Sequence, residues 1–246
     1  IVDSGVDANA NNNNAVAHTD LRGRQTAFVD YSGGAGTTDT NGHGTNVAGI
    51  AVGNGATGQT DAVAPANFLW GQGIAPGSSY VTQNFLDANV APQPAVQTLI
   101  RDSAVNLAQV MNNSWGVNNS GGDGYGANSR TIDLGVRDPN SGTAELEHLA
   151  IVCAAGNAGG RPQSIGAPHE SKNDIVVGNS LTARPGLGFP SEDIRGIAGT
   201  SGRGPAVDGR LLPTVVAPGT NVPAAFSRTA AQIRWYLADV VDALEL

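Results

Sequence analysis

Short apolar runs alternate along the chain with longer stretches whose apolar positions recur at helical spacing. The short runs predict strands at 1–2, 151–155 (IVCAA), 174–180 (DIVVGNS) and 213–219 (PTVVAPG). The helical spacing predicts helices at 45–53, 95–110, 143–150 and 229–246. Because strands that alternate with helices form parallel sheets with right-handed crossovers, the pattern predicts an α/β fold. In such sheets, ligand sites lie at the carboxyl ends of the strands.

Polar, glycine-rich stretches between these elements predict long loops at 7–20, 116–130 and 181–193. The asparagine run at 11–14 predicts a surface loop, to which we assign no function. The sequence shows no internal repeat and no linker, and 246 residues can enclose one large core. We therefore expect one domain over residues 1–246. Because the chain begins with IVDSGVD, a segment typical of the end of a buried strand, we also expect a truncated N-terminus.

Composition excludes several classes of partner and site. The net charge of −8 without a basic patch argues against nucleic acid as a partner. No apolar run approaches the roughly 18–20 residues that span a bilayer, so we expect no membrane segment. Cys153 is the only cysteine, which excludes an intrachain disulfide and argues against a cysteine metal site.

The segment IVDSGVD places Asp3 at the end of an apolar strand and before Ser4-Gly5. A carboxylate at the carboxyl end of a strand, followed by a glycine turn, is well placed to hold an imidazole. The alternative interpretation is an aspartate that caps a turn.

The segment DTNGHGTNVAG places His43 between two glycines at the start of an apolar helix. Small neighbours leave one edge of the imidazole open to a substrate, and a structural histidine rarely needs glycine on both sides. The positive end of the helix dipole disfavours an imidazolium, so a carboxylate partner would stabilise it. His18, His148 and His169 lack this setting, and His148 falls in a predicted helix.

The segment IVCAAGNAG ends a buried strand in two alanines, a glycine and Asn157. The small residues leave space for a substrate side chain, and the Asn157 amide beside them can donate a hydrogen bond to a developing oxyanion. The alternative is an ordinary strand end with Asn157 in a left-handed turn.

Together these segments resemble the subtilisin-like serine proteases, the subtilases, whose triad follows the order Asp, His, Ser. IVDSGVD is similar to the Asp segment of the family, NGHGTNVAGI to its His segment, NNSWG at 112–116 to its cleft strand and CAAGNAG to its oxyanion segment. Other similar segments lie at 18–24, 73–81 and 201–222, in the order of the family. The resemblance implies a peptidase domain with a three-layer α/β fold, in which helices cover both faces of a mainly parallel central sheet.

The resemblance also implies roles for individual residues. Asp3 would orient His43, His43 would act as general base and then general acid, and Asn157 would donate to the oxyanion. Ser114, Trp115 and Gly116 would pair with the extended backbone of a polypeptide substrate. The residues that would line the primary specificity pocket are Ala154, Ala155 and Gly156. Trp115 could instead be only a buried aromatic residue beside a turn.

The nucleophile departs from this pattern. In the family it lies in a Gly-Thr-Ser-Met-Ala-like segment after the strand VAPG, whereas Gly199-Thr200-Ser201 precedes VVAPG. Glycines and a proline follow Ser201 and disfavour the helix that should begin there. After Gly219 the only serine is Ser227, which has no Gly-Thr before it. We therefore expect that Ser201 is not the nucleophile and that the serine segment is missing near 228–229.

The sequence thus predicts a serine endopeptidase by family, with no convincing nucleophile in the chain as written. Two alternatives remain open: an inactive pseudoprotease that binds peptides, and a peptide ligase or acyl transferase on the same fold. Catalysis of this type requires no cofactor. The resemblance allows structural calcium, for which acidic loops such as 120–125 could supply oxygen ligands, although solvated loop acids are the simpler interpretation. We expect a secreted, extracellular monomer.

Overall fold

The computed structural model describes residues 1–7, 17–33, 38–58, 60, 69, 71–86, 90–116, 122–183, 193–227 and 244–245. The chain divides into two compact units. The first unit comprises residues 1–93, 182–193 and 221–238, and the second comprises 94–181, 194–220 and 239–246. The predicted single domain therefore stays a prediction, and the asparagine run at 11–14 lies outside the described residues.

The first unit contains a parallel sheet in the order β2-β3-β1, formed by Gln25–Asp30, Tyr80–Asn84 and Val2–Asp3. In the register of β1 and β3, Asp3 lies opposite Asn84, so both strands end at the same edge. Helix α1 (His43–Val52) and the short 3-10 helix η1 (Thr19–Leu21) complete the unit. Its core contains these buried residues: Val6, Ala17, Leu21, Ala48, Val52, Tyr80 and Ala225.

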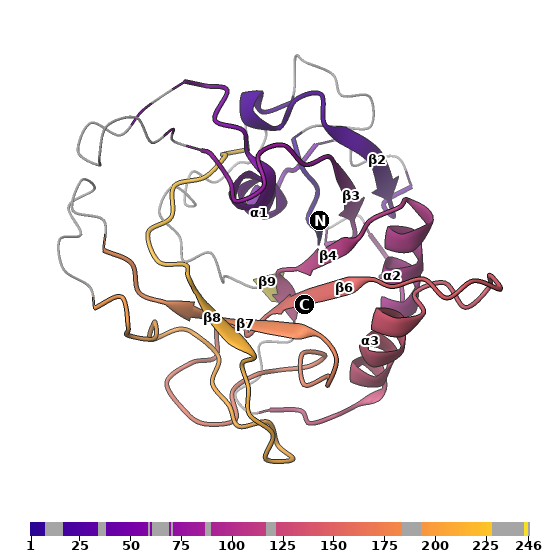
Figure 1. Cartoon of the computed structure of the whole chain (residues 1–246), viewed down its shortest axis with the longest axis vertical. Coiled ribbons are helices and arrows are strands. Elements are labelled where there is room, and N and C mark those ends of the chain that lie inside the picture. The colour runs from indigo at the N-terminus through magenta and orange to yellow at the C-terminus, as the bar shows by residue number, and fades with distance from the viewer. Residues whose placement is uncertain are drawn as a thin grey trace. The chain divides into compact units, whose positions relative to one another are not determined.

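The second unit contains a parallel sheet in the order β4-β6-β7-β8, formed by Val110–Asn113, Ala150–Ala154, Ile175–Ser180 and Val215–Pro218. Helices α2 (Val96–Val105) and α3 (Ala127–Arg137) pack side by side (Figure 1). A second parallel pair joins β5 (Trp115–Gly116) to β9 (Leu244–Glu245). The parallel strands and helices of the two units confirm the predicted α/β class.

The structure corrects one predicted helix and the end of another. Residues 143–149 form no helix, and strand β6 begins at Ala150. The Thr143 hydroxyl instead bonds to the carbonyl oxygens of Asn140 and Glu145, in competition with helical hydrogen bonds. Of the helix predicted at 229–246, residues 228–243 lie outside the described part, and Leu244–Glu245 form strand β9 opposite Trp115–Gly116.

The apolar runs predict neither helix α3 nor the strands β2, β3, β4, β5 and β9. The cleft strand that the resemblance implies at 112–116 overlaps β4 and β5. Helix α3 begins at Ala127, inside the stretch predicted as a loop. The helix predicted at 95–110 ends at Val105, because Leu107 adopts a left-handed backbone with φ of 63° and strand β4 begins at Val110. None of the helices in the described ranges has the length and apolar character needed to span a membrane.

Gly49 in α1 provides a test of the packing in the first unit. A Cβ added to Gly49 would lie 2.6 Å from the Cβ of Ala225. We expect Gly49→Ala to lower the free energy of unfolding by about 1–3 kcal/mol, despite the better helix propensity of alanine. Urea denaturation measures the change.

The matched control for this variant is Gly77→Ala. A Cβ at Gly77 would meet no atom within 4 Å. The unfolding free energy of this variant should stay within about 0.5 kcal/mol of the wild-type value. A Gly49→Ala protein as stable as the control would show that residue 225 does not pack against α1.

Candidate active site

An aspartate–histidine pair lies in the first unit. The Nδ1 atom of His43 is 2.7 Å from Oδ1 of Asp3. Both side chains are buried, with relative exposures of 4% and 0%. A carboxylate can only accept hydrogen bonds, so Nδ1 of His43 donates and Nε2 is left as the basic nitrogen.

The second oxygen of Asp3 increases the electrostatic support for His43. Oδ1 of Asp3 also accepts the Ser4 backbone N–H at 2.7 Å. Oδ2 is buried and has no hydrogen-bond partner among the described residues. Because no donor neutralises this oxygen, its negative charge favours a positive imidazole beside it. The predicted pairing of Asp3 with His43 is therefore present in the structure.

The glycines on either side of His43 have structural reasons. Gly42 has a left-handed φ of 93°, which L side chains rarely adopt. A Cβ at Gly44 would lie 2.0 Å from the carbonyl oxygen of Gly5. A side chain at residue 44 would clash with the backbone that follows Asp3. The close approach of the His43 turn to the Asp3 loop therefore requires glycine at this position.

In the second unit, the predicted substrate-binding segments lie side by side. Strands β4 and β6 run parallel with Asn113 opposite Cys153, so the residues that follow each strand share one sheet edge. The Trp115 indole is 3% exposed, and its Nε1–H donates to Oδ1 of Asn113 at 3.1 Å. The Ser114 hydroxyl accepts from Nδ2 of Asn112 at 3.0 Å. Trp115 is thus an anchored buried side chain, and the backbone of Trp115–Gly116 pairs with Leu244–Glu245 of β9 in this structure.

The segment from Ala154 to Asn157 follows β6. Gly156 has a φ of 83°, and a Cβ there would meet no atom within 4 Å. Ala155 is completely buried in a cluster with Ile165 and Val176. The Gly202 backbone N–H donates to the Gly156 carbonyl at 2.8 Å. Of this segment, Ala154, Gly156 and Asn157 are partly accessible, whereas the methyl group of Ala155 packs into the core.

His169 is a feature of this unit that the sequence did not identify. Its ring is 2% exposed and packs edge-on against Trp115, with ring centroids 5.9 Å apart. Burial lowers the pKa of His169 to about 4, so the imidazole is neutral at pH 7. A Cβ at Gly116 would lie 3.0 Å from Cε1 of His169. The imidazole therefore supports the Trp115–Gly116 strand, and no local motif in the sequence signals this role.

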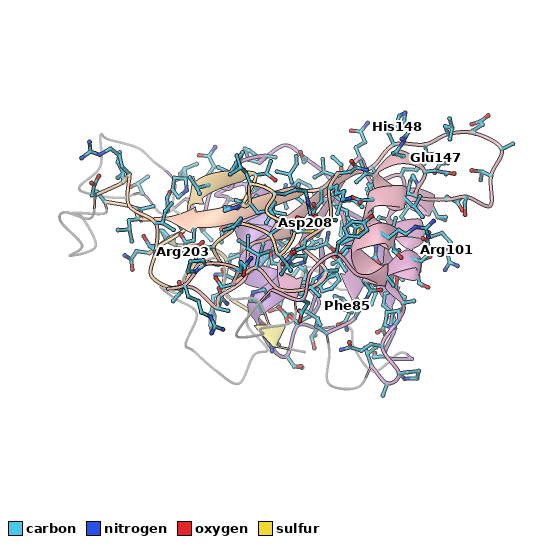
Figure 2. The ribbon with its side chains drawn as sticks, turned by 90° about the horizontal axis from the view of Figure 1, so that it is seen from below. Phe85, Arg101, Glu147, His148, Arg203 and Asp208 are labelled. Carbon is cyan, nitrogen blue, oxygen red and sulfur yellow. The ribbon has the colours of Figure 1, made fainter. Side chains whose placement is uncertain are left out.

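The other two histidines, His18 and His148, belong neither to the Asp3–His43 pair nor to the contact of His169 with Trp115. Nδ1 of His18 accepts the Asp20 backbone N–H at 3.2 Å, a bond that stabilises the turn at η1. His148 is exposed, on the irregular segment that leads into β6, and its side chain projects away from the ribbon beside Glu147 (Figure 2). His148 is thus solvated, although it does not lie on the predicted helix.

Ser201 lies in the interior of the second unit. It is 0% exposed, and its Oγ accepts the Asn179 backbone N–H at 2.9 Å and lies 3.3 Å from the Gly202 carbonyl. Ser227, in the first unit, is also 0% exposed, and its hydroxyl donates to the Asp39 carbonyl at 2.7 Å. Neither hydroxyl is accessible to a peptide in this structure.

The described residues contain no cluster of metal-binding side chains. Among them, no group of three or more His, Cys, Asp or Glu side chains is close enough to hold an ion. Within the stretch 120–125, of which residues 122–125 are described, Oδ2 of Asp123 accepts the Ala167 backbone N–H at 3.0 Å. The Asp123 carboxylate therefore acts as an acceptor for a backbone N–H group.

Comparison with known proteins identifies the family. Residues 1–240 match the subtilase family of peptidases. The serine protease AprX of Bacillus subtilis (strain 168) is 30% identical over 212 residues, which are 83% of this chain and 44% of AprX. The chain therefore spans less than half the length of that relative.

Solved structures of proteases share the fold. A psychrophilic protease, S41, aligns with a TM-score of 0.61 and 24% identity, over 98% of this chain and 71% of its own. Sphericase aligns with a TM-score of 0.61 and 20% identity, over 98% and 72%. The prenylagaramide maturation protease PagA aligns with a TM-score of 0.55 and 19% identity, over 92% and 64%. The predicted subtilisin-like fold is confirmed, and the chain belongs to the subtilase family of serine proteases.

Proposed function

We propose that this chain provides the acid–base pair and the oxyanion donor of a subtilisin-type endopeptidase. The observation that carries the proposal is the 2.7 Å contact between the buried Asp3 carboxylate and Nδ1 of His43, in a member of a serine protease family. In the proposed reaction, Nε2 of His43 takes the proton of a serine hydroxyl as that oxygen attacks the scissile carbonyl. His43 then gives the proton to the leaving amine, and Asp3 stabilises the imidazolium between the two steps.

We propose that segments of the second unit bind the substrate. We propose that an extended peptide pairs with the backbone of 114–116, where β9 pairs with Trp115–Gly116 in this structure. We also propose that the Asn157 side chain donates to the tetrahedral oxyanion. Ala154 and Gly156 add little bulk to the specificity pocket, and Gly156 has open space where a side chain would stand. We therefore expect a fairly large apolar side chain before the scissile bond.

The nucleophile of the proposed reaction is a serine other than Ser201. The position at which the family carries its serine segment, near 228–229, lies outside the described residues. We propose that the complete protein contains this serine segment. We also propose that it is a secreted monomer. The mass of the intact natural protein tests this point, because a mass equal to that of these 246 residues, 24.8 kDa, would exclude an added segment.

Peptide hydrolysis by the complete protein tests the proposed function. We expect cleavage of an unstructured peptide after large apolar residues, with no requirement for added metal. A matched peptide with glutamate in place of each large apolar residue should not be cleaved, because an acidic side chain would lose its hydration in an apolar pocket. Equal cleavage of both peptides would contradict the proposed pocket.

A second candidate, a peptide-binding pseudoprotease, is favoured by one observation. After Gly219 the written sequence contains only one serine, Ser227, and that hydroxyl is buried. Binding of an apolar peptide without cleavage, by a protein whose intact mass equals that of the written chain, would establish this alternative.

Ser201→Ala is expected to leave peptide hydrolysis unchanged. The same variant should lower the free energy of unfolding by about 1–3 kcal/mol, because the Asn179 N–H loses its buried acceptor. Activity assays and urea denaturation on one preparation measure both effects. A complete loss of hydrolysis in a folded Ser201→Ala protein would identify Ser201 as the nucleophile.

A further inference from the structure

We propose that Asp39 is a positioning residue, which holds the Asp3 loop and the His43 turn in one arrangement through hydrogen bonds to both. Asp39 lies four residues before His43 in the sequence and is 0% exposed. It does not touch the reacting atoms in the proposed mechanism. This inference rests on the proposed roles of Asp3 and His43 as the acid–base pair.

One carboxylate oxygen of Asp39 links the two segments directly. Oδ1 accepts the Ser4 hydroxyl at 2.9 Å and the Gly42 backbone N–H at 2.8 Å. The Ser4 hydroxyl in turn accepts the Gly44 backbone N–H at 3.0 Å. The residue after Asp3 and both neighbours of His43 are thus connected through a single oxygen atom of Asp39 and one hydroxyl.

The other oxygen of Asp39 binds the first turn of α1. Oδ2 accepts the backbone N–H of Thr45 at 2.8 Å and its hydroxyl at 2.7 Å. The residue at the usual capping position, Gly42, has no side chain to do this. Because the first N–H groups of a helix have no partner within the helix, Asp39 provides the missing cap. His43 is therefore fixed on a capped turn.

Asp7 makes a second link between the Asp3 segment and the His43 segment. Its Oδ1 accepts the Asp39 backbone N–H at 3.1 Å, and the Asp7 backbone N–H donates to the Thr45 hydroxyl at 3.0 Å. Each hydroxyl in this network donates one bond and accepts another. The segment that follows Asp3 is consequently joined to the segment around His43 at two separate places, Ser4 and Asp7, and both joints include Asp39.

The charge of Asp39 matters to this network because Ser4, Gly42 and Thr45 all donate to its carboxylate. Burial raises the pKa of Asp39 to about 6, with hydrogen bonds from Thr45 and Gly42 acting in the opposite direction and the nearby Asp3 charge adding to the increase. Above that pH the carboxylate is ionised and can accept all four bonds. The test below is therefore made at pH 7.5 or higher.

The test follows the Nδ1 proton of His43 by NMR, because its exchange with water reports the Asp3–His43 hydrogen bond without requiring hydrolysis. We expect Asp39→Asn, Ser4→Ala and Thr45→Val each to speed this exchange by at least about tenfold. This factor corresponds to the loss of one hydrogen bond to a charged group. Thr45→Ser keeps the hydroxyl and should exchange like the wild type. Ser4→Ala and Thr45→Val keep the Asp39 carboxylate and remove only hydrogen bonds to it. They therefore separate the effect of the hydrogen-bond network on the exchange rate from the effect of the Asp39 charge.

Asp133→Asn is the matched control. Asp133 is a buried carboxylate of the second unit that accepts the Lys172 and Asn173 N–H groups and the Tyr125 hydroxyl. This variant should lower stability and leave the His43 proton unchanged.

Two results would overturn the inference: wild-type exchange in both Ser4→Ala and Thr45→Val, or equally fast exchange in Asp133→Asn. If Asp39→Asn does not fold, the Ser4 and Thr45 variants decide alone. A protein that shows the expected exchange but no hydrolysis would contradict only the proposed function.

Discussion

Asp3→Asn is expected to lower kcat for peptide hydrolysis by the complete protein about 10⁴-fold. The amide that replaces the carboxylate has no charge to stabilise the imidazolium, and its NH₂ group can hold His43 in the wrong tautomer. The buried 2.7 Å contact makes this dependence strong, because water cannot replace the lost charge. Steady-state kinetics on a peptide that contains large apolar residues measures the effect.

Two further variants serve as controls for Asp3→Asn: His43→Ala, which removes the base, and Asp30→Asn, which changes an aspartate outside the pair. Loss of the base should reduce kcat by about 10⁶-fold. Asp30, at the end of β2 in the same unit, accepts bonds from Ser32, and its replacement by asparagine should leave the rate unchanged. If Asp3→Asn retained more than about a tenth of the wild-type kcat, Asp3 would have only the structural role of a turn residue.

Asn157→Ala is expected to lower kcat by about 10²–10³-fold and to leave KM nearly unchanged. Negative charge develops on the carbonyl oxygen only in the transition state, so a donor to that oxygen affects kcat rather than substrate binding. Kinetics at saturating and subsaturating substrate separate the two constants.

Asn173→Ala is the control for Asn157 within the same unit. Asn173 is exposed, and its amide donates only to the Asp133 carbonyl in the described contacts. Its replacement should leave both kcat and KM unchanged. An Asn157→Ala enzyme with raised KM and wild-type kcat would indicate that Asn157 contacts the bound substrate, not the oxyanion.

The sequence predicted the parts of the fold that depend on local chemistry. Strands β6, β7 and β8 have apolar runs bounded by glycine, proline or asparagine, and they appear within a residue or two of the expected places. His43 was predicted from its two glycines, and these have the special backbone and the close approach that only glycine allows.

Other features depend on tertiary contacts and left no local signal. Strand β2 (QTAFVD) has mixed polarity and is fixed by its pairing with β3. Helix α3 (ANSRTIDLGVR) follows a glycine-rich stretch and buries only a narrow face. The segment 143–149 has apolar residues at helical spacing, but Leu146 is 76% exposed and so buries little apolar surface that would stabilise a helix.

The site shows the same division. The pairing of Asp3 with His43 could be predicted because each motif carries its own chemistry. The roles of Asp39 and His169 could not, because a DTNG loop and an Ala-Pro-His turn are common polar segments. Only the fold brings Asp39 to Ser4 and Thr45, and His169 to Trp115.

We propose that Asp3 and His43 activate a serine other than Ser201. A fluorophosphonate probe, which modifies activated serine hydroxyls, tests it directly when the labelled residue of the complete protein is mapped by peptide mass spectrometry. We predict one adduct, on a serine outside the Gly199-Thr200-Ser201 triplet, and no adduct in His43→Ala. An adduct on Ser201, or labelling that persists in a folded His43→Ala protein, would contradict the claim.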